Sequence, residues 1–213
     1  SEAARSAFEN VLPSLLRVIA ASPDTERALV RFDTLIEKLP TAINFFHLLD
    51  ARPGLLDMVA HILSHAPVLA DALAQRAELL DGLIDARALD LPGSVEQIAE
   101  ELRGTEDDYE RLLDRVRERV GEHRFALGVQ LVEGAQDPLD VAEGFARVAE
   151  AAIAVLAPAA TAEFAEAHGG FKGSELALLA LGRLGGGALT YASDLDVIFL
   201  YSGVPEGESD GRR

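Results

Sequence analysis

The chain has 213 residues, contains no cysteine and carries a formal net charge of −17. A surface this acidic repels phosphate backbones and anionic lipids, so the composition argues against a nucleic-acid binder or a peripheral membrane protein. Without cysteine there is neither a disulfide framework nor a thiolate metal site, and the N-terminus lacks the pattern of a signal peptide, so we expect a cytoplasmic protein. We also expect no membrane span, because no apolar run reaches the required length of about 18 residues.

Residues 1–170 have a helical pattern, with apolar side chains recurring at spacings of three and four. The clearest break is "LDLPGS", after which Ser94 and Gln97 have the spacing of a capping box. Thr105 and Asp108 repeat that spacing at the next helix. A further helix is expected from about Leu139, and Pro158 should kink or end it.

The pattern changes after residue 170. The apolar run at 175–181 lies between glycines, and "DVIFLY" at 196–201 is β-branched and aromatic, so we predict two strands. The predicted fold is mainly α: a helical bundle or linker over 1–170, then the truncated start of an α/β domain over 171–213. Because the chain begins with Ser1 rather than Met and stops soon after the second strand, we expect a piece of a larger protein.

Two helical segments carry polar residues that could form other sites. Asp57, His61 and His65 recur every four residues and could hold a metal ion, but the apolar residues between them already explain a packing helix, which we favour. The Arg-rich "ERLLDRVRERVGEHR" has acidic residues interleaved at spacings of three and four, which is typical of a solvated, ion-paired helix surface.

The stretch "GRLGGGALTYASDLDVIFLY" at 182–201 joins a glycine cluster to two aspartates. It matches neither the dinucleotide fingerprint nor the phosphate-binding P-loop. Residues i and i+2 of a strand point to the same side, so Asp194 and Asp196 should lie side by side. We expect the intervening and following apolar residues, Leu195, Val197 and Phe199, to point the other way into a core.

Two neighbouring carboxylates repel each other unless a cation lies between them. Mg²⁺ suits that position, because it is usually bound by one or two carboxylates together with substrate phosphates. The N–H groups of a glycine loop can bind those phosphates. On chemistry alone, the pattern indicates either a site for a nucleoside triphosphate with its metal or an Asp-capped turn without a ligand.

The stretch "LGRLGGGALTYASDLDVIFLY" resembles the signature of the glutamine synthetase adenylyltransferases, members of the nucleotidyltransferase superfamily. The upstream "FFHLLDARPGLLDMVAHILSH" and "EHRFALGVQLVEG" are similar to the helical linker of that family, so the resemblance covers nearly the whole chain. Ala188 departs from the signature, since the family often has Glu there. The matching positions are Gly182, Arg183, Leu184, Gly185, Gly186, Leu189, Ser193, Asp194, Leu195 and Asp196.

The resemblance implies a large enzyme with two nucleotidyltransferase halves of opposite sense. One attaches AMP from ATP to a tyrosine of glutamine synthetase, and the other removes it by phosphorolysis. The helical approach to the motif looks more like that of the second, AMP-attaching half. The implied partners are glutamine synthetase and a PII-type signal protein.

The resemblance also implies roles for individual residues. Asp194 and Asp196 would ligate Mg²⁺ and act in catalysis, and Gly185 and Gly186 would approach the ATP phosphates. Ser193 would orient the aspartate turn. Two alternatives stay open: a nucleotidyltransferase with another acceptor, and a helical regulatory or docking module without catalysis.

The family needs a third carboxylate on a later strand, and no such strand precedes Arg213. We therefore expect the 213-residue chain alone to have no catalytic turnover. Incubation with glutamine synthetase and α-labelled ATP measures this directly. Labelled tyrosine above the protein-free control would contradict the expectation.

Overall fold

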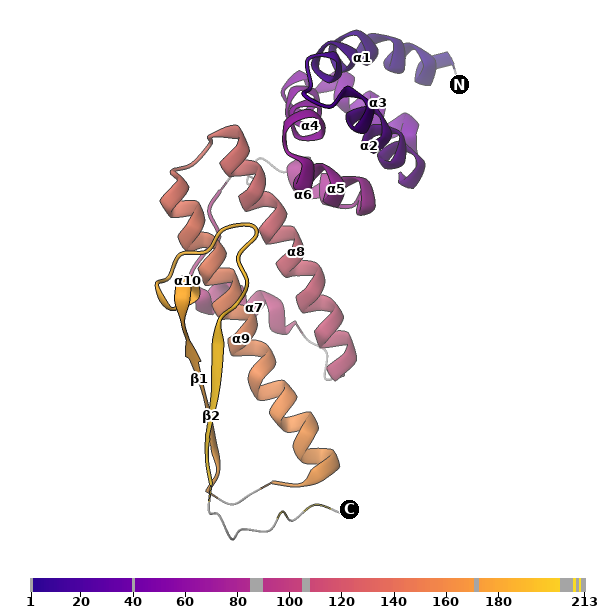
Figure 1. The fold of residues 1–213 in the computed structure, drawn as a ribbon. Helices are drawn as coiled ribbons and strands as arrows, with labels where there is room; N and C mark the ends of the chain where they lie inside the picture. The colour runs from indigo at the N-terminus through magenta and orange to yellow at the C-terminus, as the bar shows by residue number, and fades with distance from the viewer. Residues whose placement is uncertain are drawn as a thin grey trace. The chain divides into compact units, whose positions relative to one another are not determined.

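A computed structural model describes residues 2–39, 41–84, 90–104, 108–170, 173–203, 209 and 211. The fold is mainly helical and ends in a two-stranded antiparallel sheet, as predicted (Figure 1). The chain forms two compact units, one of Ser1–Asp90 with Gly128–Ala135 and one of Leu91–Leu127 with Gln136–Arg213. The break expected at "LDLPGS" therefore coincides with a unit boundary. The expected domain division after residue 170 stays a prediction.

The first unit is built from short amphipathic helices. In it α1 packs on α3 and α4, and α2 packs on α5. The core includes Leu15, Leu35, Leu49 and Leu63, all nearly or fully buried. The helices are α1 (Glu2–Ala20), α2 (Thr25–Lys38), α3 (Ala42–Ala51), α4 (Pro53–His65), α5 (Pro67–Gln75) and α6 (Leu79–Ile84).

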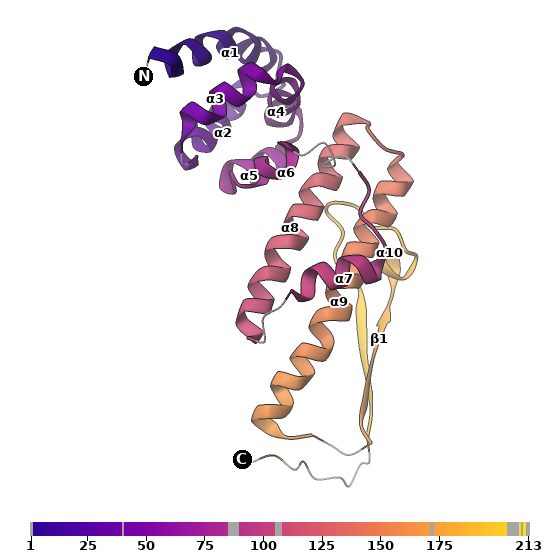
Figure 2. The same cartoon turned by 180° about the vertical axis from the view of Figure 1, so that it is seen from behind.

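The second unit contains α7 (Val95–Arg103), α8 (Tyr109–Glu133) up to Leu127, and α9 (Pro138–His168). The predicted capping box is confirmed: Ser94 accepts from the Gln97 N–H, and the Gln97 side chain accepts from the Ser94 N–H. Asp108 accepts a hydrogen bond from the Arg111 N–H at the start of α8. The other expected member of that pair, Thr105, lies outside the described residues. In Figure 2, α7 crosses α9, and the two helices share a hydrophobic core.

Helix α9 bears on two expectations. Pro158 lies inside the helix and does not end it, so of the expected kink or end only the kink stays a prediction. Proline removes one N–H bond, but the surrounding alanines have high helix propensity and the helix continues to His168. By length and composition α9 could also cross a membrane, contrary to the expectation that no segment could. Val141, Phe145 and Val148 in its first half are buried in the core, but only 17% of the 18-residue window that could cross a membrane is buried.

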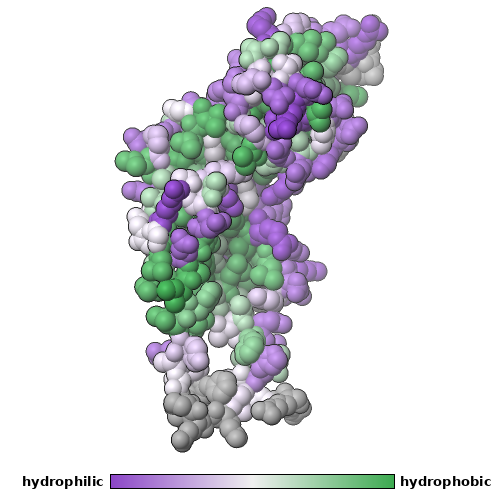
Figure 3. Space-filling model, in the orientation of Figure 1, coloured by the Kyte–Doolittle hydropathy of each residue, from purple (hydrophilic) through white to green (hydrophobic). Residues whose placement is uncertain are grey.

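Strands β1 (Glu175–Ala180) and β2 (Val197–Ser202) pair antiparallel, from Glu175–Ser202 to Ala180–Val197. They fall within one residue of the predicted strands. Most of their side chains are exposed, and apolar side chains gather over this ribbon on the face shown in Figure 3.

The expected inward face of the second strand is wrong for two residues. Leu195 is 46% exposed and Phe199 is 63% exposed, while Val197 is partly buried against the helical core. These side chains are exposed because a ribbon of two strands has little surface that packs against the helices. Only the end near Ala180 and Val197 reaches the core of α7, α8 and α9.

The buried positions of the second unit should dominate its stability. Leu102 is fully buried in that core, whereas Leu139 is 73% exposed in the first turn of α9. Leu102→Ala should lower the free energy of unfolding by about 2–5 kcal/mol, because it leaves a cavity. Guanidinium unfolding followed by circular dichroism measures the loss.

Leu139→Ala is the matched control, and it should change the free energy of unfolding by less than about 0.5 kcal/mol. Equal losses in the two variants would show that the core assignment is wrong.

Candidate functional site

The glycine cluster and the aspartate pair form one closed loop between β1 and β2. The Leu181 N–H donates to the Asp196 carbonyl at 2.8 Å, one pair beyond the strand ladder. Asp194 and Asp196 therefore lie in the segment that leads into β2, not inside a strand as predicted. The ladder stops there because Gly182, with φ +55°, turns the chain away from β1. The expectation that both carboxylates point to one side stays a prediction.

The neck of this loop requires glycine at two positions. At Gly182 the positive φ disfavours any residue with a side chain, and a Cβ there would also displace the exposed carboxylate of Asp196. A Cβ at Gly185 would lie 2.6 Å from the carbonyl oxygen of Ala180 in β1. The short helix α10 (Gly182–Gly185) can thus sit directly against the end of the ribbon.

A small hydrogen-bonded turn precedes the aspartates. The Ser193 N–H donates to the Thr190 carbonyl at 3.1 Å, and the Thr190 N–H donates to Ser193 Oγ at 2.9 Å. The two hydroxyls lie 2.8 Å apart, and Arg183 Nη1 donates to both at 3.3 Å. Ser193 is thus bonded to the turn that leads into Asp194.

Apolar anchors hold the loop on the helices. Leu184 and Leu189 are buried in the core that α7, α8 and α9 form. The Leu189 N–H also donates to the Ala142 carbonyl in α9 at 3.0 Å. The loop is therefore anchored before and after Gly185, Gly186 and Gly187.

Tyr191 is a third anchor. Its ring makes an edge contact with Phe145 of α9 at 6.1 Å between centroids. The guanidinium of Arg124, in α8, lies 5.3 Å from the ring centroid and donates from Nη2 to the Tyr191 carbonyl at 2.6 Å. Burial raises the pKa of the Tyr191 phenol, and the positive charge of Arg124 opposes that shift.

The structure brings the five predicted site residues into this one loop. The backbone of Gly185 and Gly186 and the side chains of Asp194 and Asp196 are exposed, and Ser193 is partly buried. In the described part of the chain neither aspartate forms an ion pair with a cationic side chain. Two accessible carboxylates not already neutralised by protein cations fit the oxygen ligands that Mg²⁺ prefers.

No group of three or more metal-ligating side chains occurs among the described residues. Val59, Ile62 and Leu63, which lie among Asp57, His61 and His65 on α4, are fully buried, in agreement with the packing helix that we favoured. His61 Nδ1 lies 2.9 Å from a carboxylate oxygen of Glu133, and the centroid of its ring lies 4.9 Å from that of His65, with the two rings tilted by 59°.

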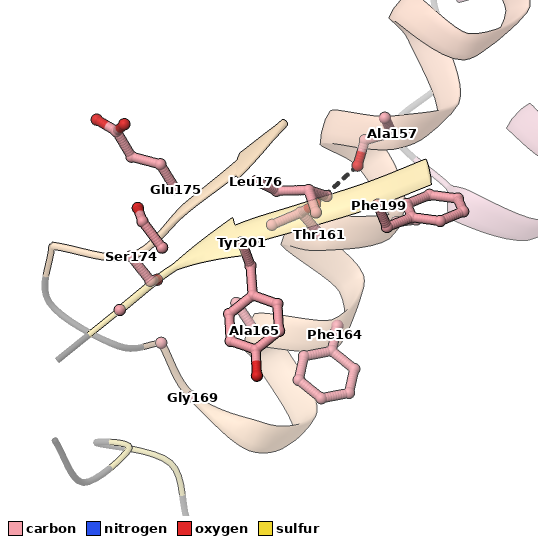
Figure 4. A pocket seen from close by; sticks show the side chains of 14 residues that line it. Ala157, Thr161, Phe164, Ala165, Gly169, Ser174, Glu175, Leu176, Phe199 and Tyr201 are labelled. Carbon is pink, nitrogen blue, oxygen red and sulfur yellow. Dashed lines mark hydrogen bonds between the residues drawn. The ribbon is translucent and has the colours of Figure 1, made fainter. Parts of the chain in front are cut away.

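A separate apolar groove of about 960 Å³ lies between the second half of α9 and the ribbon. Figure 4 shows Phe164 of α9 beside Tyr201 of β2, with Thr161 donating to the Ala157 carbonyl at 2.8 Å. Phe164 and Tyr201 are 60% and 85% exposed. Among the described residues that line the groove, Glu175 alone is charged, so the chemistry of the groove differs from that of the aspartate loop.

The sequence pattern did not indicate a role for Tyr191 or Arg124. Arg124 belongs to the Arg-rich stretch that was predicted to be an ion-paired surface, and Arg117 and Arg119 do form such pairs with Asp114 and Glu122. Arg124 differs because it contacts a residue 67 positions later. An aromatic residue between the glycines and the aspartates was the available signal.

Comparison with known proteins gives concordant matches. The family model described as glutamate-ammonia ligase adenylyltransferase matches residues 56–213. The chain is 36% identical to the bifunctional glutamine synthetase adenylyltransferase/adenylyl-removing enzyme of Brucella melitensis and 38% identical to that of Mesorhizobium japonicum. These alignments cover 100% and 99% of this chain, but only 22% of either relative.

The glycines of the loop should differ in their tolerance of a side chain. Gly182→Ala should destabilise the second unit by at least about 1–2 kcal/mol, because it forces a left-handed alanine into contact with Asp196. Gly186→Ala is the matched control, since its Cβ would make ordinary contacts, at 3.5 Å from the Gly182 carbonyl oxygen. Thermal unfolding of both variants checks this, and equal melting temperatures would contradict it.

Proposed function

Because the chain belongs to the glutamate-ammonia ligase adenylyltransferase family, we propose that it forms part of an enzyme that transfers AMP from ATP to a tyrosine of glutamine synthetase. One observation carries the proposal. The family match includes the whole loop at 181–196, in which exposed Asp194 and Asp196 follow a glycine turn. The chain spans 22% of the length of the relatives, so the activity, substrate and partners are proposed for the intact protein.

The proposed roles follow from the loop geometry. Asp194 and Asp196 would hold Mg²⁺, which when bound neutralises charge on the attacking and leaving oxygens. Gly185 and Gly186 are exposed and have no side chains, so their backbone leaves room for the phosphates of ATP.

Ser193 keeps the turn before Asp194 closed through its bonds to Thr190. Its role is to position the carboxylate rather than to react. The tyrosine hydroxyl of glutamine synthetase would attack the α-phosphorus of ATP, forming an O–P bond to AMP and releasing pyrophosphate.

We assign the chain to the AMP-attaching half, because the helical approach to its motif resembles that half. The relatives carry both activities in their names, and we propose that removal of AMP belongs to another part of the intact protein. We further propose that a PII-type signal protein regulates the enzyme through the helical segment.

We propose a cytoplasmic enzyme that acts on neither nucleic acid nor membrane. The net charge of −17 opposes binding to phosphate backbones and anionic lipids. The first half of α9 buries Val141, Phe145 and Val148 in the core next to the loop, which supports a scaffold role for that half of the helix.

The aspartates can be tested in a chimera in which this chain replaces the matching region of the Brucella melitensis enzyme. The chimera should label glutamine synthetase with AMP from α-labelled ATP. Asp194→Asn and Asp196→Asn should each lower kcat by at least about a hundredfold, the scale of losing one group that stabilises transition-state charge.

Glu163→Gln is the control, because it removes one negative charge from an exposed position on α9. It should leave kcat unchanged. A folded chimera without transfer, or one in which the two aspartate variants keep full activity, would refute the proposed function.

A further inference from the structure

Tyr191 links the aspartate loop to two helices at once. Its ring lies against Phe145 of α9, and its ring and carbonyl both contact Arg124 of α8. Only two residues separate Tyr191 from Asp194, and the bonds between Thr190 and Ser193 close that short turn. A displacement of Tyr191 is therefore passed to the backbone of Asp194.

Arg124 can make both contacts because its guanidinium is planar and carries several donors. One nitrogen donates to the Tyr191 carbonyl at 2.6 Å while the carbon at the centre of the group lies 5.3 Å from the ring centroid. A lysine ammonium would supply a charge near the ring but not the same fixed pair of contacts.

Other charged groups on α8 have different partners. Arg117 pairs with Asp114 and Arg119 pairs with Glu122, in both cases within one turn of the same helix. Arg124 instead spans 67 residues to reach the loop. Its contact with Tyr191 can transmit a movement of α8 to the aspartates.

We propose that Arg124 is a positioning residue, which fixes the Asp194–Asp196 segment for nucleotide transfer by holding Tyr191 against α8 and α9. The catalytic purpose of this positioning rests on the proposed function. The anchoring itself can be tested on the 213-residue chain without any activity.

Amide hydrogen exchange followed by NMR reports on the anchoring. The N–H groups of Leu181, Thr190 and Ser193 are hydrogen-bonded within the loop. In Arg124→Gln they should exchange roughly tenfold faster, since a charge-assisted hydrogen bond and a cation–π contact are lost. The amides of α7 should keep their exchange rates.

A titration of Tyr191 separates this role from a general loosening of the fold. In a background with Tyr109→Phe and Tyr201→Phe, the absorbance of the remaining phenol follows its ionisation. Arg124→Gln should raise the pKa of Tyr191, because the positive charge that opposes the burial effect is gone. Arg124→Lys should keep the original midpoint while the loop amides exchange at an intermediate rate.

Arg117→Gln is the matched control, with the same change of charge on the same helix. It should alter neither the titration nor the exchange. Loop exchange that stays unchanged in Arg124→Gln, or a Tyr191 midpoint that does not rise, would overturn the positioning role.

Activity in the chimera distinguishes the two proposals. Arg124→Gln should lower kcat roughly tenfold with an unchanged KM for glutamine synthetase, because Arg124 acts through Tyr191 and the aspartate turn. An unchanged kcat would also overturn the positioning role. An inactive wild-type chimera would refute the proposed function. The exchange and titration results test independently whether Arg124 anchors Tyr191.

Discussion

Residues 181–196 hold the candidate site, and their conformation depends on what lies beneath them. Apart from the single turn of α10, the loop has no regular hydrogen-bond ladder of its own. Leu184 and Leu189 are buried in the helical core, and burial of a leucine contributes roughly 1.5–3 kcal/mol. The surface hydrogen bonds of Thr190 and Ser193 contribute roughly 0.5–1.5 kcal/mol each. Apolar burial therefore sets where the loop sits, and the polar bonds set its local shape.

Gly182 and Gly185, where the loop leaves β1, determine the backbone path of the loop. At Gly182 the chain turns with a φ of +55°, which a residue with a side chain rarely adopts. Gly185 lets α10 approach the carbonyl of Ala180. The glycine cluster thus has a structural reason independent of any ligand. That reason does not compete with the proposed phosphate contacts, because the backbone of Gly185 and Gly186 stays exposed.

Local chemistry was readable from the sequence. The capping box at Ser94 and both strands were predicted within a residue of their observed positions, because caps and β-branched runs act over short distances. Pro158 does not end α9, because a helix can lose one bond inside an alanine-rich stretch. Phe199 is exposed rather than buried as predicted, because the alternation of side chains along a strand shows which residues share a face but not what covers that face.

In the candidate site, too, the local features could be predicted from the sequence and the contacts between distant segments could not. The glycines and aspartates are adjacent in sequence, so their proximity in one loop was predictable. The contacts of Tyr191 with Arg124 and Phe145 were not, because they join segments 67 and 46 residues apart, and periodicity within one helix does not reveal its partner.

The helices before the loop are therefore part of the site's construction. Residues 171–213 taken alone would leave Leu184 and Leu189 without cover, since the core that buries them consists mainly of side chains from α7, α8 and α9. Tyr191 would likewise lose both of its ring contacts. Any change that shifts α8 against α9 must either break the Arg124 contact or carry the aspartate turn with it. A helical segment built in this way can influence nucleotide chemistry without contributing a reacting group.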